Sequence, residues 1–513
     1  MLVNLRHNLA NPLVLVGMMF FILCYLFSPQ PDYLLLLTMA QLVFVPAMVK
    51  MIVDLQTVGK IVLVIMMGTV TLLHWFSAGW LADLLAIMYV FYTVFIAWQG
   101  VKRFLQRGFT DIAEIMIDIG LLYIFMGGLW FFAYTAQIDT GFSPLITWLT
   151  AIHFHYSACI LIISVGLFGR IHKSKGYTMV AVILLAGPIL TALGITFSKV
   201  LEVVSVVLYI VAIYILFALT IKSKLPVIQG VLLRISYGSL CVTILWSLLY
   251  AFGYVTIPRM LQFHGVMNGL LFAGIGVLAW AMAVPPTKQQ TVQFPVSQIR
   301  GKLRTQQEPH AGLVDSLQDF VNTTEVPPAI VHFYEHTTQY RLLASVQWRG
   351  WFKPFALVYQ GISRIIQQLN LPFSSKQIEM TGKIVKVSAQ EDGRVAPRAW
   401  IRTIGRQTVF TAIYSQHTTK ETTYMNIALP LPFSTMVGVL YVEAKNGQLH
   451  LTSEQDGDAG IYLAIGRFVC KLPLQEHFII TVKDTSALTA SHQMRLFGLP
   501  FLRIEYVIEP TNL

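Results

Sequence analysis

Six residues in long apolar stretches of the sequence have side chains that could bind a ligand or move a proton: His74, His153, His155, Tyr156, His264 and Asn268. Ionisable side chains at membrane depth are costly, so each is a functional candidate by default. Imidazoles bind metal ions and haem iron, and they exchange protons near neutral pH. Asn268 follows His264 by four residues and shares its helix face. Together these residues are the candidates for a ligand or proton site.

Three interpretations of these histidines are open. A metal or haem site would use imidazoles on facing helices, with His153 or His155 opposite His264 as the ligands. A polar cavity would use them for substrate binding or a proton relay. A structural role would satisfy them with Tyr, Ser or Asn on neighbouring helices. Residues two apart on a helix point about 200° away from each other, so at most one of His153 and His155 can serve a given centre.

A second group of charged residues begins the apolar run near 111–135. Asp111, Glu114 and Asp118 recur at helical spacing and form an acidic stripe. Asp111 and Glu114 suit the membrane interface, where they complement the helix dipole. Asp118 lies deeper and needs a partner, and Arg234 in the run near 228–252 stands at a comparable depth. We therefore expect an Asp118–Arg234 ion pair, with a structural or a gating role.

The polar half of the chain offers weaker candidates. His332 and His336 are four residues apart, but Glu335 stands beside the second histidine, so the metalloprotease pattern fails. The acidic segment 454–458 lacks the ligand spacing of an EF-hand and is typical of a solvated turn. Neither segment names a reaction, and we lean towards a protein that is not an enzyme.

The composition divides the chain into two regimes. Hydrophobic residues make up 55% and charged residues 12% of the 513 residues, against roughly 45–50% and 25% in soluble proteins. Residues 1–285 hold only 22 of the 61 charged side chains. A soluble enzyme throughout is excluded, and without a basic block we expect no nucleic-acid partner. The four cysteines imply no disulfide framework.

Ten apolar runs predict a multi-pass bundle in the lipid bilayer, because a spanning helix needs about 20 mostly apolar residues. Basic residues gather in the N-terminus, at Arg6, and in every connection from an even to an odd run. The positive-inside rule then puts both termini in the cytoplasm. The runs lie near 12–28, 33–49, 60–77, 81–100, 111–135, 144–168, 177–197, 199–221, 228–252 and 260–283.

The expected domains are a ten-span membrane domain (1–283), a polar linker (284–310) and a cytoplasmic domain (311–513). The last should begin with helices near 311–322, 328–336 and 353–369. From 379 the hydrophobic period falls to two, which predicts an antiparallel sheet, sandwich or partly open barrel. The fold class is thus a helical transmembrane bundle followed by an α+β, mainly antiparallel β domain. Aromatic and basic residues alternate over 348–355, which suits a membrane interface or a core edge equally.

Short motifs resemble a known family. The segments His153-Phe-His155-Tyr156 and Phe263-His264-Gly265 resemble the YndJ-like family of bacterial multi-pass membrane proteins. The segments 429–433, 450–453 and 494–501 resemble a domain of unknown function found in the same proteins and in saccharopine-dehydrogenase-like fusions. The resemblance implies a bacterial cytoplasmic-membrane location and assigns the histidines no role.

These observations favour a transporter-like or ligand-binding bundle with a cytoplasmic β-rich sensing or scaffold domain. A small-molecule ligand would then occupy a cavity lined by the histidines. The alternatives are a membrane enzyme or redox protein with haem or a transition metal at His153 and His264, and a purely structural or interaction protein.

Overall fold

The computed structural model describes residues 11–287, 292–303, 308–366, 368–405, 407–484 and 487–511. It divides into two compact units, one of residues 1–104 and 111–289 and the other of residues 105–110 and 290–513. The first unit is helical and the second is built on strands. Arg6, used above for orientation, and parts of the expected linker 284–310 lie outside the described residues.

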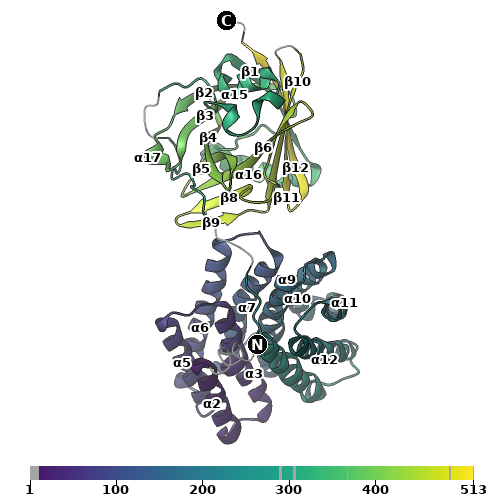
Figure 1. Ribbon diagram of the computed structural model, residues 1–513. Helices are drawn as coiled ribbons and strands as arrows, with labels where there is room; N and C mark the ends of the chain where they lie inside the picture. Colours follow the sequence, from purple (N-terminus) through teal and green to yellow (C-terminus); the bar gives the residue numbers. More distant parts are fainter. Residues whose placement is uncertain are drawn as a thin grey trace. The chain divides into compact units, whose positions relative to one another are not determined.

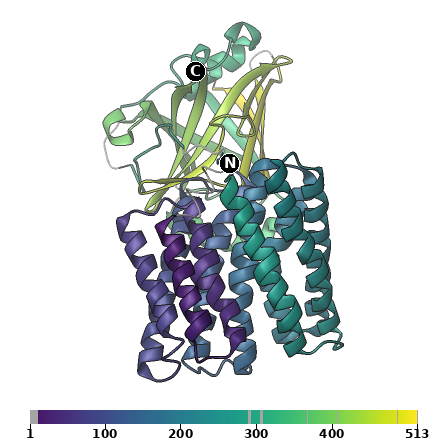
Figure 2. The same cartoon turned by 60° about the horizontal axis from the view of Figure 1, so that its bottom comes forward.

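The helical unit contains the expected apolar spans (Figures 1 and 2). Two apolar helices, α2 (Pro12–Phe27) and α5 (Thr57–Leu72), have 16 residues each and are slightly shorter than the usual spanning length of about 17–25 residues. Among the described residues, eight helices are long and apolar enough to cross a membrane: Asp32–Ile52, α6 (Trp80–Leu105), α7 (Ile112–Thr135), Pro144–Ile171, α10 (Lys175–Phe197), α11 (Lys199–Lys222), α12 (Val227–Ala251) and Ile257–Met282.

Three of these helices contain π-helical turns. Asp32–Ile52 joins η1 (Asp32–Leu34), α3 (Leu35–Met39), η2 (Ala40–Phe44) and α4 (Val45–Ile52). Pro144–Ile171 joins α8 (Pro144–His153), η3 (Phe154–Ile160) and α9 (Leu161–Ile171). Ile257–Met282 contains α13 (Ile257–Met260), η4 (Leu261–Gly265), η5 (Asn268–Gly274) and α14 (Ile275–Met282). π-Turns are rare in proteins overall, and those that occur are often found at functional sites. Here η3, η4 and η5 carry His155, Tyr156, His264 and Asn268.

The second unit is a closed antiparallel β-barrel. Each strand of the ring pairs with two neighbours, in the order β1-β2-β3-β4-β5-β6-β7-β10-β11-β12 and back to β1. The hairpin of β8 and β9 is attached to β6. The strands are β1 (Tyr340–Trp348), β2 (Ile378–Lys386), β3 (Val395–Ile404), β4 (Gln407–Thr419), β5 (Thr422–Leu431), β6 (Ser434–Lys445), β7 (Gln448–Thr452), β8 (Gly460–Ile465), β9 (Phe468–Lys471), β10 (Leu474–Val482), β11 (Leu488–Leu496) and β12 (Leu499–Pro510).

Short helices accompany the barrel, and one of them fills it. Ile330, Phe333 and Tyr334 of α15 (Pro328–Glu335) are buried and pack in the same core as the inward side chains of the strands. The remaining helices are α16 (Lys353–Ile366) and α17 (Ala389–Asp392), with 3₁₀ turns η6 (Leu317–Asp319), η7 (Thr323–Glu325), η8 (Thr337–Gln339) and η9 (Gly350–Phe352).

Two expectations for this unit were wrong. The segment 311–322 forms only the turn η6 instead of a helix. The sheet begins at Tyr340 rather than near 379, because β1 pairs along its whole length with β12, from Tyr340 opposite Pro510 to Trp348 opposite Leu502. Asn446-Gly447, a residue pair that favours two-residue hairpin turns, connects β6 and β7, and both residues have positive φ, of 54° and 71°.

A candidate ligand cavity between the membrane helices

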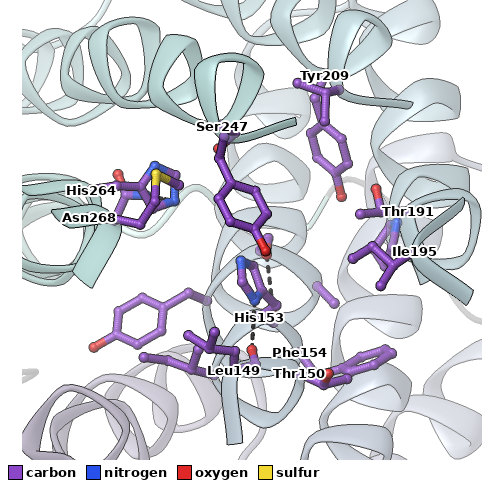
Figure 3. A pocket seen from close by; sticks show the side chains of 18 of the residues that line it. Leu149, Thr150, His153, Phe154, Thr191, Ile195, Tyr209, Ser247, His264 and Asn268 are labelled. Carbon is purple, nitrogen blue, oxygen red and sulfur yellow. Dashed lines mark hydrogen bonds between the residues drawn. The ribbon is translucent and has the colours of Figure 1, made fainter. Parts of the chain in front are cut away.

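A largely apolar cavity of about 400 Å³ lies inside the helical unit (Figure 3). Five membrane helices supply most of its wall, namely Pro144–Ile171, α10, α11, α12 and Ile257–Met282, and Trp130 of α7 also contributes to it. Four of the six sequence candidates line it, namely His153, Tyr156, His264 and Asn268. His74 and His155 do not. The polar side chains of the wall that the sequence did not single out are Thr150, Ser157, Thr191, Thr196, Lys199, Glu202, Tyr209, Thr243, Ser247 and Tyr250.

His153 presents one ring nitrogen to this cavity. Its Nδ1 lies 2.6 Å from the carbonyl oxygen of Leu149, one turn earlier. A carbonyl only accepts, so the proton of the neutral ring sits on Nδ1 and donates to Leu149. Nε2 then carries a lone pair, and no side chain of the described residues hydrogen-bonds to it. His153 can therefore accept a hydrogen bond from a ligand.

His264 is held by a closed ring of hydrogen bonds. Its Nδ1 donates to the carbonyl of Thr243 at 2.9 Å, and the Nδ2 amide of Asn268 donates to its Nε2 at 3.0 Å. The Thr243 hydroxyl completes the ring by donating to Asn268 Oδ1 at 2.7 Å. Both nitrogens of His264 are engaged, so this ring fixes the imidazole and ties α12 to the last membrane helix.

The arrangement does not fit a metal or haem held between His153 and His264. A ligating imidazole needs a free nitrogen lone pair, and that of His264 Nε2 is directed at Asn268. Among the described residues no three His, Cys, Asp or Glu side chains gather as a metal site. His332 and His336 instead stack on each other, and His332 Nδ1 lies 2.9 Å from the Tyr340 hydroxyl.

The other two membrane histidines have protein partners on both ring nitrogens. His155 is fully buried and donates from Nδ1 to Ala151, and its Nε2 accepts from the Tyr89 hydroxyl at 2.5 Å. His74 lies in a second, more polar cavity of about 600 Å³. The hydroxyls of Ser28 and Thr38 stand 2.7 Å and 2.9 Å from its two nitrogens. These contacts favour a structural role for both residues.

An ion pair and a proline also line the first cavity. Lys199 and Glu202, at the start of α11, lie 2.9 Å apart and both contribute to the wall. Pro188 stands inside α10 and lines the same wall. The helix continues through it to Phe197. The Tyr123 hydroxyl donates to the carbonyl of Leu185, three residues before the proline, at 2.7 Å.

The expected ion pair between Asp118 and Arg234 is wrong. Asp118 Oδ1 lies 2.7 Å from Arg103 Nε, while Arg234 Nη2 donates to the Ile221 carbonyl at 3.5 Å. Matching depth does not tell which helices are neighbours. α6 precedes α7 through a short loop, so Arg103 in its last turn lies beside the first turns of α7.

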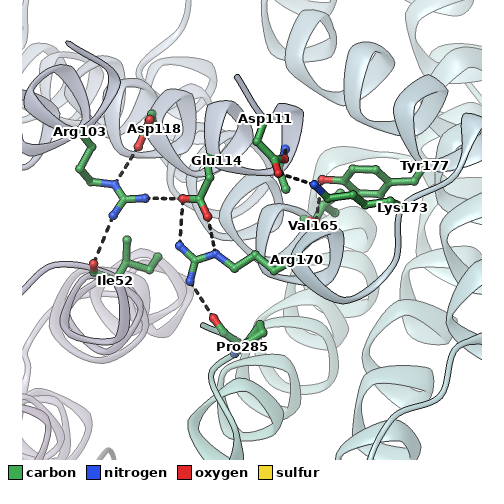
Figure 4. A network of polar contacts seen from close by, with 11 residues as sticks. Ile52, Arg103, Asp111, Glu114, Asp118, Val165, Arg170, Lys173, Tyr177 and Pro285 are labelled. Atoms are coloured by element: carbon green, nitrogen blue, oxygen red, sulfur yellow. Dashed lines mark hydrogen bonds and ion pairs between the residues drawn. The ribbon is translucent and has the colours of Figure 1, made fainter. Parts of the chain in front are cut away.

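Glu114, expected at the interface, is instead the buried centre of this network (Figure 4). Its carboxylate lies 2.9 Å from Arg103 and 2.7 Å from Arg170. Arg170 also donates to the Pro285 carbonyl at 2.8 Å, and Arg103 to the Ile52 carbonyl at 3.4 Å. The network thus joins α6, α7 and α9 to the ends of two further helices.

A third polar group lies inside the barrel and was not predicted. Burial raises the pKa of Glu476 to about 7. Burial, with a smaller effect of Arg402, lowers the pKa of His492 to about 3. The Arg402 guanidinium stacks 3.6 Å from the centre of the Phe410 ring and 4.1 Å from that of Trp400. Strand alternation directs Arg402 inward, but only the closed barrel shows that this face is an interior.

Comparisons with known proteins agree with this architecture. The YndJ-like protein family matches residues 35–272. A protein of Bacillus subtilis (strain 168) named "Uncharacterized membrane protein YndJ" is 38% identical over 460 residues, which cover 83% of this chain and 84% of that protein. No solved structure matches. The extent and identity of the match show that this chain, a multi-pass membrane protein, belongs to the YndJ-like family.

Proposed function

We propose that the helical unit binds an amphipathic, lipid-like molecule in the cavity lined by His153 and His264. The observation that carries this proposal is the combination of volume and lining. About 400 Å³ falls in the range of small-molecule sites, which are mostly apolar with a few placed polar groups. The wall of this cavity is dominated by Ile, Leu, Phe, Tyr and Ala side chains.

The polar groups of the wall define the part of the ligand that is not apolar. His153 Nε2 accepts a hydrogen bond, so the ligand would offer a hydroxyl or amine there. The Lys199–Glu202 pair can exchange its internal contact for a charged or zwitterionic head. The π-turns of η3 and η4 support this function, because such turns collect at binding sites. A transporter or a lipid-sensing protein would use this arrangement.

The experiment measures the lipid-like molecules that stay bound to the detergent-purified full chain, by extraction and mass spectrometry. Ala192→Phe fills the cavity from α10 and is expected to reduce the retained molecules at least about tenfold. Ile189→Phe, on the same helix but exposed outside the cavity wall, is the matched control. Equal retention by both variants would refute the site.

We also propose that the barrel lies in the cytoplasm. The support is the gathering of Lys102, Arg103, Arg170, Lys173 and the residues Lys222 and Lys224 in alternate connections between the membrane helices. The test uses a cysteine at Asn446, in the β6–β7 turn of the barrel, and a membrane-impermeant maleimide. Labelling in inverted but not in right-side-out vesicles is expected, and the reverse pattern would overturn the orientation.

A further inference from the structure

One end of the barrel carries exposed aromatic and apolar side chains. In an antiparallel barrel, strands that run in the same direction finish at the same end. β1, β3, β5, β7, β8 and β11 share this direction, and the turns and helix α16 that follow β1, β3, β5, β8 and β11 lie at this end. We call this end, with its residues Trp351, Phe355, Phe433, Phe497 and Leu499, the aromatic end; all five are exposed, Phe433 at the tip of the β5–β6 turn by 90%.

Helix α16 turns its apolar face outward. Phe355, Val358, Ile362 and Ile365 recur at three- and four-residue spacing, which places them on one helix face, and they are 62%, 71%, 50% and 81% exposed. The small residues Ala356 and Ser363 are the buried ones. A surface helix of a soluble protein buries its apolar stripe. The outward apolar face of α16 therefore indicates contact with an apolar environment outside the barrel.

Basic residues accompany the aromatic ones at this end. Arg349, Lys353 and Arg364 lie in or next to α16, and Arg467 lies in the β8–β9 turn. Trp and Phe beside Lys and Arg are the composition of helices that lie in the membrane interface. The opposite end differs, since its turns are polar: Lys420-Glu421 between β4 and β5, and Asn446-Gly447 between β6 and β7.

The chain itself limits how far the barrel can be from a bilayer. The last membrane helix ends at Met282, and Ser297 is fixed to the barrel unit by donating to Asp392 Oδ1 at 2.6 Å. The intervening residues can span at most about 50 Å when fully extended. The bilayer is therefore always within reach of this exposed apolar surface and can cover it.

We propose that the aromatic end of the barrel docks on the headgroup region of the bilayer that the helical unit spans, with α16 lying in the interface and Phe433 inserted beside it. The basic residues bind anionic headgroups. Trp348 and Phe352 are excluded from this surface, because they stack on each other and pack in the barrel core. Only the exposed aromatic residues of this end therefore belong to the proposed docking surface.

The test uses the full chain in liposomes that contain phosphatidylglycerol and a nitroxide-labelled phosphatidylcholine. The four native cysteines are buried, so single cysteines at Phe433, Ile362 and, as the matched control in a turn of the opposite end, Asn446 can carry an environment-sensitive fluorophore. We expect the nitroxide lipid to quench the labels at 433 and 362 at least about twofold more than the label at 446.

Two results would overturn the proposal. Equal quenching at all three positions would show that the aromatic end does not meet lipid. Protection of 433 and 362 from aqueous iodide without quenching by the nitroxide lipid would show that protein, either the helical unit or a second copy, covers this surface. Replacing phosphatidylglycerol by phosphatidylcholine tests the basic residues, and the lipid quenching should then decrease. These readouts do not depend on whether the helical cavity binds a ligand.

Discussion

His153 and His155, two residues apart in one membrane helix, serve different surroundings. His153 lines the cavity between the membrane helices, and no side chain of the described residues hydrogen-bonds to its Nε2, while His155 is fully buried with its Nε2 bound to the Tyr89 hydroxyl at 2.5 Å. Their separation around the helix axis sends one side chain to the cavity and the other to the interface with α6. The same short motif therefore contains one candidate binding residue and one packing residue.

This difference predicts opposite effects of two alanine substitutions. His155→Ala leaves a void and a buried Tyr89 hydroxyl without its partner, so it should cost about 3–5 kcal/mol of stability. His153→Ala removes a side chain exposed to the cavity and should cost less than about 1 kcal/mol. Thermal unfolding of the delipidated full chain in one detergent measures both. Equal losses would contradict the different environments.

The network around Glu114 predicts which arginine matters for folding. Arg103→Met leaves the buried carboxylates of Asp118 and Glu114 with less compensation and should cost about 3–5 kcal/mol. Arg234→Met should cost less than about 1 kcal/mol, because the contact of Arg234 with Ile221 is long. The yield of folded protein in membranes and its thermal stability check this order. A larger loss at Arg234 would restore the pair expected from the sequence.

Two buried groups in the barrel interior predict opposite pH dependences of its stability, and a single substitution should reveal one of them. The pKa of His492 falls from 6.5 to about 3 on folding, so the unfolded chain binds the extra proton and stability rises with pH between these values. The pKa of Glu476 rises from 4.5 to about 7, so the folded chain holds that proton and stability falls with pH over this range. The two slopes cancel between pH 4.5 and 6.5.

Glu476→Gln removes the falling contribution. Between pH 4.5 and 6.5 the free energy of unfolding of the barrel should then rise more steeply with pH than in the unmodified chain, by about 1.4 kcal/mol per pH unit. Denaturant titrations of the full chain at several pH values measure it. Glu421→Gln, in the exposed β4–β5 turn, is the control and should keep the pH profile of the unmodified chain. A slope for Glu476→Gln equal to that of the unmodified chain would contradict the opposed titrations.

Close helix packing at Gly17 predicts a further contrast. A Cβ added there would overlap the carbonyl oxygen of Leu42 in η2, and a backbone atom cannot move away cheaply. Gly17→Ala should therefore cost about 1–3 kcal/mol. Gly68 on α5 faces open space among the described residues, so Gly68→Ala should stabilise its helix by about 0.5–1 kcal/mol. Paired melting temperatures measure both, and the same sign for both would refute the packing.

Local patterns in the sequence determined the elements of this protein. Runs of apolar residues located the membrane helices to within a few residues, because a bilayer admits little except a long apolar helix. Period-two alternation and the Asn446-Gly447 turn located most strands in the same way. The sequence also brought His153, Tyr156, His264 and Asn268 together as candidates, and these four residues line one cavity.

Only the tertiary structure decided which elements are neighbours. Asp118 pairs with Arg103 rather than Arg234, since ion pairing depends on adjacency between helices and not on depth alone. β1 joins β12 across more than 150 residues, and this pairing closes the barrel around Arg402 and Glu476. Long-range contacts of this kind produce no periodic pattern in the local sequence. The chemistry of the sites therefore rests on packing that the sequence encodes only through the whole fold.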